Sequence, residues 1–216
     1  MIRNLVFDMG GVLIAWSPRR LVARLGVEGE DARLLLREVF GDQEWVGLDR
    51  GRLTEEEALA RFRARLPRRL HEAARRLVYW WRDELWPVPG MEELLKELKA
   101  AGYGIYLLSN ATAALHEYFP RIPGAALFDG LLVSADFGLL KPQHEIFETL
   151  FARFGLAPEE SFFVDDSNVN VDGALVVGMS AAVFDGDLPR LRRALKDAGV
   201  RLGADYCESS ASTVNI

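Results

Sequence analysis

The chain has 216 residues, of which 50% are apolar and 27% are charged, so it can bury one large core or a core that carries an insert. Its net charge of −6 excludes a general binder of nucleic acid or of anionic membranes, because those surfaces attract basic proteins. The single cysteine, Cys207, excludes an intrachain disulfide and is typical of a reducing compartment. No apolar run reaches the roughly 18 residues of a spanning helix, and the N-terminus lacks the layout of a signal peptide. We therefore expect a cytoplasmic monomer or homodimer with no nucleic-acid or membrane partner.

Two kinds of pattern divide the chain. A strand-like run at 5–7 is followed by helical periodicity from about residue 18 to 86, with a cap-like start at Thr54 and no convincing strand. Beyond it, helical stretches alternate with short apolar runs in the rhythm of a βα repeat. The expected helices there are 91–101 and 142–154, and the expected strands are 103–108, 131–133, 161–164 and 181–184.

This order predicts an α/β fold, in which a Rossmann-like parallel sheet is covered on both faces and carries an all-helical insert after its first strand. We expect a core of residues 1–15 and 87–202, a helical insert of 16–86 and a frayed polar tail of 203–216. Within the insert, the segment 45–51 reads as a glycine-containing turn between helices, so Trp45, together with Trp16 where the chain leaves the core, could face a ligand.

Polar residues follow four of the expected strands at the point where each strand ends. They are Asp8, Gly10 and Gly11 after the first strand, Ser109 and Asn110 after the second, Lys141 after the third, and Asp165 and Asp166 after the fourth. Each signal alone is more often a turn, a helix cap or a solvated cation. Because ligands of open α/β sheets bind beyond the carboxyl ends of the strands, however, we expect these residues to gather at one edge.

The paired Asp165 and Asp166 are the strongest single signal, because like charges side by side need a cation or a proton. A helix N-terminus could also stabilise one of them. Asp8 is expected at the same edge, and the sequence has no cysteine–histidine cluster. Carboxylates of this kind favour a hard divalent ion, which points to Mg²⁺.

Phosphoryl transfer is the chemistry that fits this set. With the ion screening its charge, Asp8 can act as a covalent nucleophile and form an acyl phosphate. The Ser109 hydroxyl, the Lys141 ammonium group and backbone N–H groups around Gly10 and Asn110 can stabilise the oxygens of the transferring group.

The same residues resemble the four motifs of the haloacid dehalogenase-like hydrolases, in chain order and over nearly the whole chain. The matching segments are 7–13, 107–110, 138–142 with Ile146 and Phe147, and 163–174. The resemblance implies that the insert is the family's small mobile cap. The start of the first motif and the Asp-Asp-x-x-x-Asn pattern at 165–170 are similar to bacterial sugar-phosphate phosphatases, particularly those acting on glucose 1-phosphate.

The resemblance also implies roles for single residues. Asp8 would be nucleophile and metal ligand, with Asp166 as the second metal carboxylate, Asp165 binding the ion directly or through water, and Gly10 adding its backbone carbonyl. Ser109, Asn110, Gly11 and Lys141 would bind the phosphate of a small metabolite, and Lys141 would restrain Asp8. Asp136 either orients Lys141 or is an exposed loop acid.

One position departs from the family pattern. Most family phosphatases have a second Asp two residues after the nucleophile, which protonates the leaving oxygen; here that position is Gly10. General acid–base catalysis contributes about 10²–10⁴ in rate, so its loss should be felt. A substitute acid could be His116, Asp172 or Asp49, or the substrate could have a good leaving group, as a sugar 1-phosphate does.

Two other functions remain open. A metal-independent 2-haloacid dehalogenase uses the same Asp nucleophile and lacks the second Asp, but the resemblance implies uncharged residues where this chain has Asp165 and Asp166. A metal-free site would leave that pair uncompensated, which favours the phosphatase. A catalytically weak protein that binds phosphorylated ligands is the other alternative, because the usual second Asp is Gly10.

Overall fold

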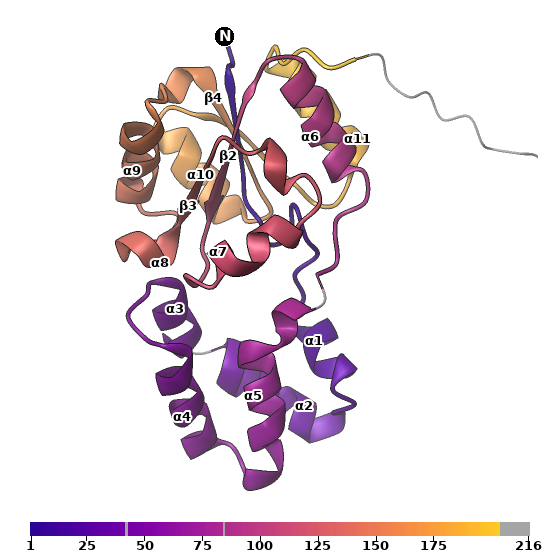
Figure 1. Cartoon of the computed structure of the whole chain (residues 1–216), viewed down its shortest axis with the longest axis vertical. Helices are drawn as coiled ribbons and strands as arrows, with labels where there is room; N and C mark the ends of the chain where they lie inside the picture. Colours follow the sequence, from indigo (N-terminus) through magenta and orange to yellow (C-terminus); the bar gives the residue numbers. More distant parts are fainter. Residues whose placement is uncertain (42, 84, 204–216) are drawn as a thin grey trace, which may run out of the picture.

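The computed structural model describes residues 1–41, 43–83 and 85–203. Five parallel strands form one sheet in the order β3-β2-β1-β4-β5 (Figure 1). The strands are β1 Asn4–Phe7, β2 Gly104–Ser109, β3 Gly130–Val133, β4 Ser161–Asp165 and β5 Ser180–Val183. All five expected strands are present, and each bound differs from its expected place by one residue at most. The expectation of a parallel α/β sheet is confirmed.

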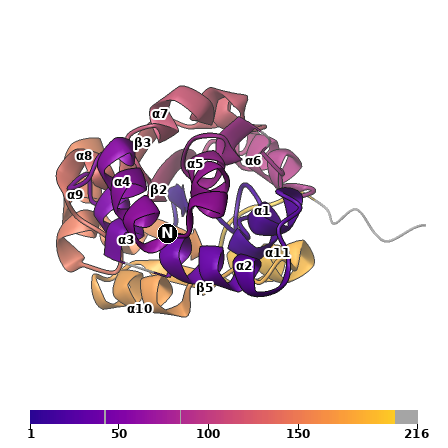
Figure 2. The same cartoon turned by 90° about the horizontal axis from the view of Figure 1, so that it is seen from below.

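Strand β1 lies at the centre of the sheet and is buried on both faces. It pairs with β2 and β4, so that Phe7 lies opposite Leu107 and Val164. Leu5 and Phe7 pack on one face with α6 (Met91–Ala100) and α11 (Leu188–Asp197). Val6 packs on the other with α9 (His144–Phe154) and α10 (Asn168–Val176). Figures 1 and 2 show these helix pairs on opposite sides of the sheet. Because helices pack against β1 on both faces of the sheet, the end of the strand, where Asp8 lies, is held in a fixed position.

The helices of the core begin and end close to the expected places. Helix α6 starts after Gly90. Helix α9 ends at Phe154 and is capped by Gly155, whose φ of 65° is the left-handed conformation that glycine adopts most easily. Helix α9 starts at His144, two residues later than expected, because Gln143 is its N-cap residue. Two short helices complete the core, α7 (Leu115–Tyr118) and α8 (Ser134–Phe137), with 3₁₀ turns at Phe119–Arg121, Ala125–Leu127 and Pro158–Glu160.

Residues 18–83 form a separate helical lobe, which we call the cap, below the sheet in Figure 1. Its helices are α1 Pro18–Arg24, α2 Gly29–Leu35, α3 Gln43–Asp49, α4 Glu55–Arg65 and α5 His71–Tyr79, with a π-helical turn at Leu36–Phe40 and 3₁₀ turns at Arg68–Leu70 and Trp81–Asp83. The cap has its own hydrophobic cluster, in which Leu35, Phe62 and Leu77 are among the most deeply buried side chains.

The expected turn at 45–51 is wrong over most of its length, because α3 continues through Asp49. Gly47 lies inside this helix, where Leu53 packs against its Cα so closely that a Cβ atom would lie 2.8 Å from Leu53 Cδ1. The chain turns only at Arg50 and Gly51. A Cβ on Gly51 would lie 2.4 Å from the carbonyl oxygen of Ala135, so this turn rests directly on α8 of the core.

Two chain segments connect the lobes and pair with each other. Ile14 and Pro87 form an antiparallel bridge, the Ala15 N–H donates to the Trp86 carbonyl at 2.7 Å, and the Val88 N–H donates to the Leu13 carbonyl at 2.9 Å. The lobes also touch at the α3–α8 edge (Figure 1). There the Ser134 hydroxyl donates to the Asp49 carbonyl and Arg50 Nη2 donates to Gln143 Oε1 at 3.2 Å.

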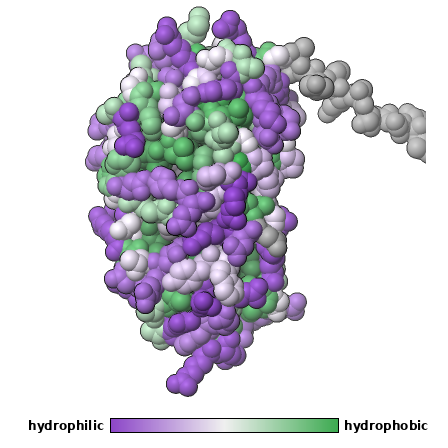
Figure 3. All heavy atoms as spheres, in the orientation of Figure 1, coloured by the Kyte–Doolittle hydropathy of each residue, from purple (hydrophilic) through white to green (hydrophobic). Residues whose placement is uncertain are grey.

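No helix among the described residues is long and apolar enough to span a bilayer. Figure 3 shows hydrophilic side chains over much of this face of both lobes, with hydrophobic patches between them. Residues 204–216, most of the expected tail and Cys207 with it, lie outside the described part of the chain.

Candidate active site

Asp8 lies directly beyond β1 at the carboxyl edge of the sheet. Its backbone N–H extends the ladder by donating to the Val164 carbonyl at 2.9 Å, and its Oδ1 accepts from the Met9 N–H at 2.6 Å. Only 8% of the residue is exposed. Burial raises the pKa of Asp8 to about 6. The positive charge of Lys141 opposes this rise, and the negative charge of Asp165 adds to it.

The chain turns sharply after Asp8. The Met9 carbonyl accepts from the N–H groups of Leu13 at 2.8 Å and Ile14 at 3.1 Å. Gly11 has φ of 76°, and a Cβ atom there would lie 2.1 Å from Asp166 Oδ2. Glycine is therefore required at position 11 both by the backbone conformation and by the carboxylate that lies against it.

Lys141 is fully buried behind Asp8. Its Nζ lies 2.9 Å from Asp8 Oδ1, 2.6 Å from Asp165 Oδ2 and 2.8 Å from the Leu108 carbonyl oxygen. Burial opposes its positive charge, but the two carboxylates outweigh burial and raise the pKa of Lys141. The ammonium group thus holds Asp8 and Asp165 in place.

Asp165 is the last residue of β4, and Asp166 follows it. Asp165 is buried, and its Oδ1 accepts from the Ser167 N–H at 2.9 Å and from Asn170 Nδ2 at 3.0 Å. Asp166 is more exposed; partial burial and the neighbouring Asp165 raise its pKa. Carboxylate oxygens of Asp8, Asp165 and Asp166 lie within 4.8 Å of one another. Three carboxylates this close carry more negative charge than the one Lys141 ammonium group can balance. Their oxygen atoms are the donors that suit a hard ion such as Mg²⁺.

Ser109 and Asn110 end β2 beside Asp8. Ser109 is 1% exposed. The Asn110 side chain is paired with the Lys141 backbone: Nδ2 donates to the Lys141 carbonyl at 3.1 Å, and Oδ1 accepts from the Lys141 N–H at 2.8 Å. This double hydrogen bond ties the end of β2 to the loop that carries the lysine.

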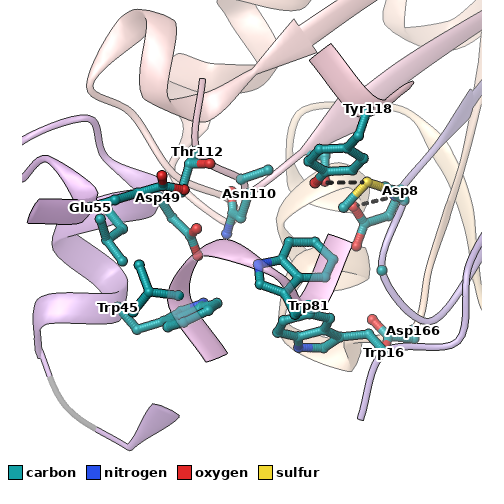
Figure 4. Close-up of a pocket in the computed structure, with 16 residues that line it drawn as sticks. Asp8, Trp16, Trp45, Asp49, Glu55, Trp81, Asn110, Thr112, Tyr118 and Asp166 are labelled. Atoms are coloured by element: carbon teal, nitrogen blue, oxygen red, sulfur yellow. Dashed lines mark hydrogen bonds between the residues drawn. The ribbon is translucent and has the colours of Figure 1, made fainter. Parts of the chain in front are cut away.

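A cavity of about 150 Å³ lies between this edge of the sheet and the cap (Figure 4). Asp8, Gly10, Ser109, Asn110 and Asp166 line it, and Lys141, Asp165 and Gly11 lie behind the first layer. The structure thus brings the eight residues of the strand-end motifs to one place. The cap contributes Trp45, Leu48, Asp49, Glu55, Val78 and Trp81 to the lining, and Trp16 adds to it from the segment that connects the lobes.

Of the three candidate substitute acids, only Asp49 lies at the cavity. His116 is on the surface, where its Nε2 lies 2.8 Å from Asp136, and Asp172 is exposed on α10. Asp136 therefore contacts His116 rather than Lys141. Burial raises the pKa of Asp49 well above its usual range; the charge of Asp8 adds to the rise, and Lys141 opposes it.

Sequence reasoning gave Asn170 no role beyond its place in the 165–170 pattern and did not single out Ser134 or Tyr118. Asn170 stands in the fourth motif at the spacing that lets its amide reach Asp165, which is a usable signal. Ser134 accepts from the Ala111 N–H at 2.9 Å and donates to the Asp49 carbonyl, a link between core and cap. Tyr118 lines the cavity from α7. The places of Ser134 and Tyr118 depend on how segments far apart in the sequence pack together, and no local sequence pattern predicts this.

Comparison with known proteins agrees with the geometry. Residues 2–178 match the model of the family described as haloacid dehalogenase-like hydrolase. The chain is 30% identical over 178 residues to a sesquiterpene phosphatase, astK, of Aspergillus oryzae, covering 81% of this chain and 85% of that protein. It is 29% identical over 186 residues to a D-ribitol-5-phosphate phosphatase of Bacteroides thetaiotaomicron, covering 79% and 86%.

A solved structure supports the same assignment. A HAD family enzyme of Bacteroides thetaiotaomicron, crystallised as a magnesium complex, is similar with a TM-score of 0.67 and 25% identity, over 89% of this chain and 98% of that one. The strand-end motifs, the inserted cap and the family match over residues 2–178 lead to one conclusion. The chain belongs to the haloacid dehalogenase-like hydrolases.

Proposed function

We propose that this enzyme is a Mg²⁺-dependent phosphomonoesterase that forms an aspartyl phosphate on Asp8. The observation that carries the proposal is the cluster of Asp8, Asp165 and Asp166 at the cavity floor, with Lys141 bridging the first two. Asp8, Asp166 and the Gly10 carbonyl, with Asp165 beside them, would hold the ion. When bound, Mg²⁺ would supply the positive charge that lets an anionic phosphate approach three carboxylates.

The chain's own residues account for the two chemical steps. In the first, a carboxylate oxygen of Asp8 bonds to phosphorus, the ester P–O bond breaks and its electron pair leaves on the alcohol oxygen. In the second, water attacks phosphorus, the bond to Asp8 breaks and inorganic phosphate is released. Lys141 holds Asp8 in position throughout. The Ser109 hydroxyl and the backbone N–H groups of Gly10 and Asn110 would donate to the phosphoryl oxygens, whereas the Gly11 N–H is already paired with the Ile14 carbonyl at 2.8 Å.

Asp49 is the residue that we propose supplies the missing acid. It enters the cavity from the cap, and burial favours its neutral form, which can give a proton to the leaving oxygen and then take one from water. We expect Asp49→Asn to lower kcat/KM, which reports the departure of the leaving group, about 10²–10⁴-fold for an alkyl phosphate, whose alkoxide leaves poorly. The same variant should lower kcat/KM far less for p-nitrophenyl phosphate, whose leaving group needs no proton. An equal loss on both substrates would contradict the assignment.

The substrate is a small phosphorylated metabolite, as the names of the relatives suggest. Their organic parts range from ribitol to a sesquiterpene, and the sugar phosphate implied by the sequence resemblance lies within that range.

The cavity disfavours a 2-haloacid as substrate. Its lining holds Asp8, Asp166, Asp49 and Glu55 but, among the described residues, no Lys, Arg or His. In a metal-free site a haloacid carboxylate would face the carboxylates of Asp8 and Asp166 with no cationic side chain in the lining, whereas a phosphate would share the site with Mg²⁺.

The test of the function uses a generic aryl phosphate with and without Mg²⁺. We expect Asp8→Asn or excess chelator to abolish hydrolysis, and Asp172→Asn, which changes an exposed acid on the neighbouring helix α10, to leave it unchanged. Full activity in Asp8→Asn would refute the mechanism. Halide release from 2-chloropropionate in chelator would support the dehalogenase, and stabilisation by phosphate esters without turnover would support the binding protein.

A further inference from the structure

We propose that the organic part of the substrate is an apolar hydrocarbon chain rather than a polyol or a sugar. This inference rests on the phosphatase function proposed above and concerns which phosphate monoester the site takes. It is carried by the apolar side chains that line the cavity, five of which belong to residues 16–81, while the motifs that resemble sugar-phosphate phosphatases lie in the core.

The cap side of the cavity is largely aromatic and aliphatic. Five of its seven lining residues are apolar, namely Trp16, Trp45, Leu48, Val78 and Trp81. In Figure 4, Asp8 and Asp166 lie towards one end of the cavity and Trp45 and Glu55 towards the other, with Trp16 and Trp81 between them.

The aromatic rings form one continuous wall. The ring centroids of Trp45 and Trp16 are 5.8 Å apart, those of Trp16 and Trp81 are 4.7 Å apart, and those of Trp81 and Tyr118 are 5.4 Å apart. Phe40 supports Trp45 from behind, with centroids 4.8 Å apart. Rings that pack on one another in this way form a stiff apolar surface along the path from the phosphate site into the cap.

Several polar side chains along this path already have partners. Glu55 accepts from Arg82 Nη1 at 2.6 Å and from Nη2 at 3.3 Å. The Tyr118 hydroxyl points to Met9 Sδ at 3.5 Å, and the Asn110 amide is paired with the Lys141 backbone. The hydroxyl groups of a sugar would lose their water against these walls with few groups left to pair with, which costs binding free energy.

Gly10 is part of the same wall. A Cβ atom at this position would lie 3.5 Å from Trp16 Cβ and 3.7 Å from Trp16 Cγ, so the indole packs over the glycine. Where most of the family carries an acidic side chain beside the nucleophile, this chain therefore presents an aromatic surface.

The size of the cavity sets the length of chain that fits. About 150 Å³ is the size of an apolar protein cavity that takes up benzene, so a chain of about six carbons is a suitable probe. The matched pair of substrates for the test is therefore hexyl phosphate and sorbitol 6-phosphate, which have the same number of carbons and a primary phosphate ester, and differ in their hydroxyl groups.

The experiment compares kcat/KM for this pair in Mg²⁺, together with the series from ethyl to hexyl phosphate. We expect hexyl phosphate to exceed sorbitol 6-phosphate by at least about 100-fold. Along the series, kcat/KM should rise about fourfold for each methylene that enters the cavity.

Two tryptophan variants connect the preference to the wall. Trp45→Ala should flatten the dependence of kcat/KM on chain length, because Trp45 lines the end of the cavity away from Asp8 and Asp166. Trp80→Ala is the matched control, because Trp80 is 42% exposed, lies 5.0 Å from the Arg75 guanidinium and does not line the cavity. It should keep the full dependence on chain length.

The outcomes separate this inference from the proposed function. If sorbitol 6-phosphate is hydrolysed as well as hexyl phosphate or better, and Asp8→Asn abolishes both activities, the inference is overturned and the phosphatase stands. If neither ester is hydrolysed, binding of hexylphosphonate and methylphosphonate in Mg²⁺ decides. Tighter binding of hexylphosphonate than of methylphosphonate would support the apolar binding site, although the proposed phosphatase activity would be wrong. Equal binding of the two would overturn both proposals.

Discussion

Lys141 balances the negative charge of the site, and its removal is the most informative single change for stability. Lys141→Met keeps a similar length but leaves Asp8 and Asp165 side by side in a buried place without their cation. We expect a loss of about 3–5 kcal/mol in the free energy of unfolding of the metal-free protein, measured with urea.

The control for this prediction is Lys99→Met. Lys99 pairs with Asp129 at 2.5 Å, but both side chains are about one-third exposed. An exposed pair of this kind contributes about 1 kcal/mol at most. Equal losses in the two lysine variants would show that the charge balance of the site does not govern stability.

Mg²⁺ affinity should depend on pH through Asp8. Its pKa is raised to about 6, so below that pH a proton occupies the carboxylate and has to be displaced by the ion. We expect the affinity measured by calorimetry to be constant above about pH 7 and to fall towards tenfold per pH unit below about pH 6, the slope for one displaced proton. In Asp8→Asn the part of this fall that comes from Asp8 should be missing, and what remains reports on Asp166, whose pKa is also raised. A wild-type affinity that stays flat from pH 8 to 5 would rule out the raised pKa of Asp8.

At the scale of residues, the sequence predicts the site well where a side chain directly follows a strand. Asp8, Ser109 and Asp165 are placed by the strand that precedes them, so locating the strands locates them. Asp49 and Ser134 are different, because they meet only when the cap docks on α8. No local pattern encodes a contact between segments about 85 residues apart.

At the scale of elements, α4 has the clearest start in the chain. The Thr54 hydroxyl accepts from the Glu57 N–H at 3.2 Å while the Glu57 carboxylate accepts from the Thr54 N–H at 2.9 Å. Thr54→Ala should reduce the free energy of unfolding by about 1 kcal/mol, because the first turn of α4 loses an acceptor.

Thr149→Ala is the matched substitution for this test. Thr149 lies inside α9, and its hydroxyl donates to the Glu145 carbonyl of the same helix, so it caps nothing. The change should have an effect near zero or slightly stabilising, since alanine has the higher helix propensity. Chemical denaturation of both variants checks the difference, and a cost for Thr149→Ala as large as that for Thr54→Ala would contradict it.

Elements with a clear period were easier to predict than their connections. The five strands are short apolar runs between helices, so their existence and order could be read directly. The prediction of a turn at 45–51 was wrong because it relied on Gly47, and glycine usually breaks a helix. Here the missing side chain of Gly47 makes room for Leu53 instead, a tertiary reason that the sequence alone does not reveal.

At the scale of the whole molecule, metal binding should stabilise the native state. The cluster of Asp8, Asp165 and Asp166 comes together from the ends of β1 and β4 and does not exist in an unfolded chain. Mg²⁺ at about 100 times its dissociation constant should therefore add about 2.7 kcal/mol to the free energy of unfolding. A thermal melt with and without Mg²⁺ measures this, and Asp166→Asn should largely remove the shift. A wild-type melt that Mg²⁺ leaves unchanged would argue against the metal site.

The paired connections at Leu13–Ala15 and Trp86–Val88 have a mechanical consequence for the whole molecule. The two connecting segments are hydrogen-bonded to each other at one edge of the molecule, so we expect the cap to open by rotation about that edge, as in a hinge motion. The widest opening then falls at the far edge, where Asp49 and Arg50 meet the core. The rotation that admits a substrate would thus carry Asp49 away from the nucleophile. The proton donor and the reacting ester would then come together only in the closed state of the cap.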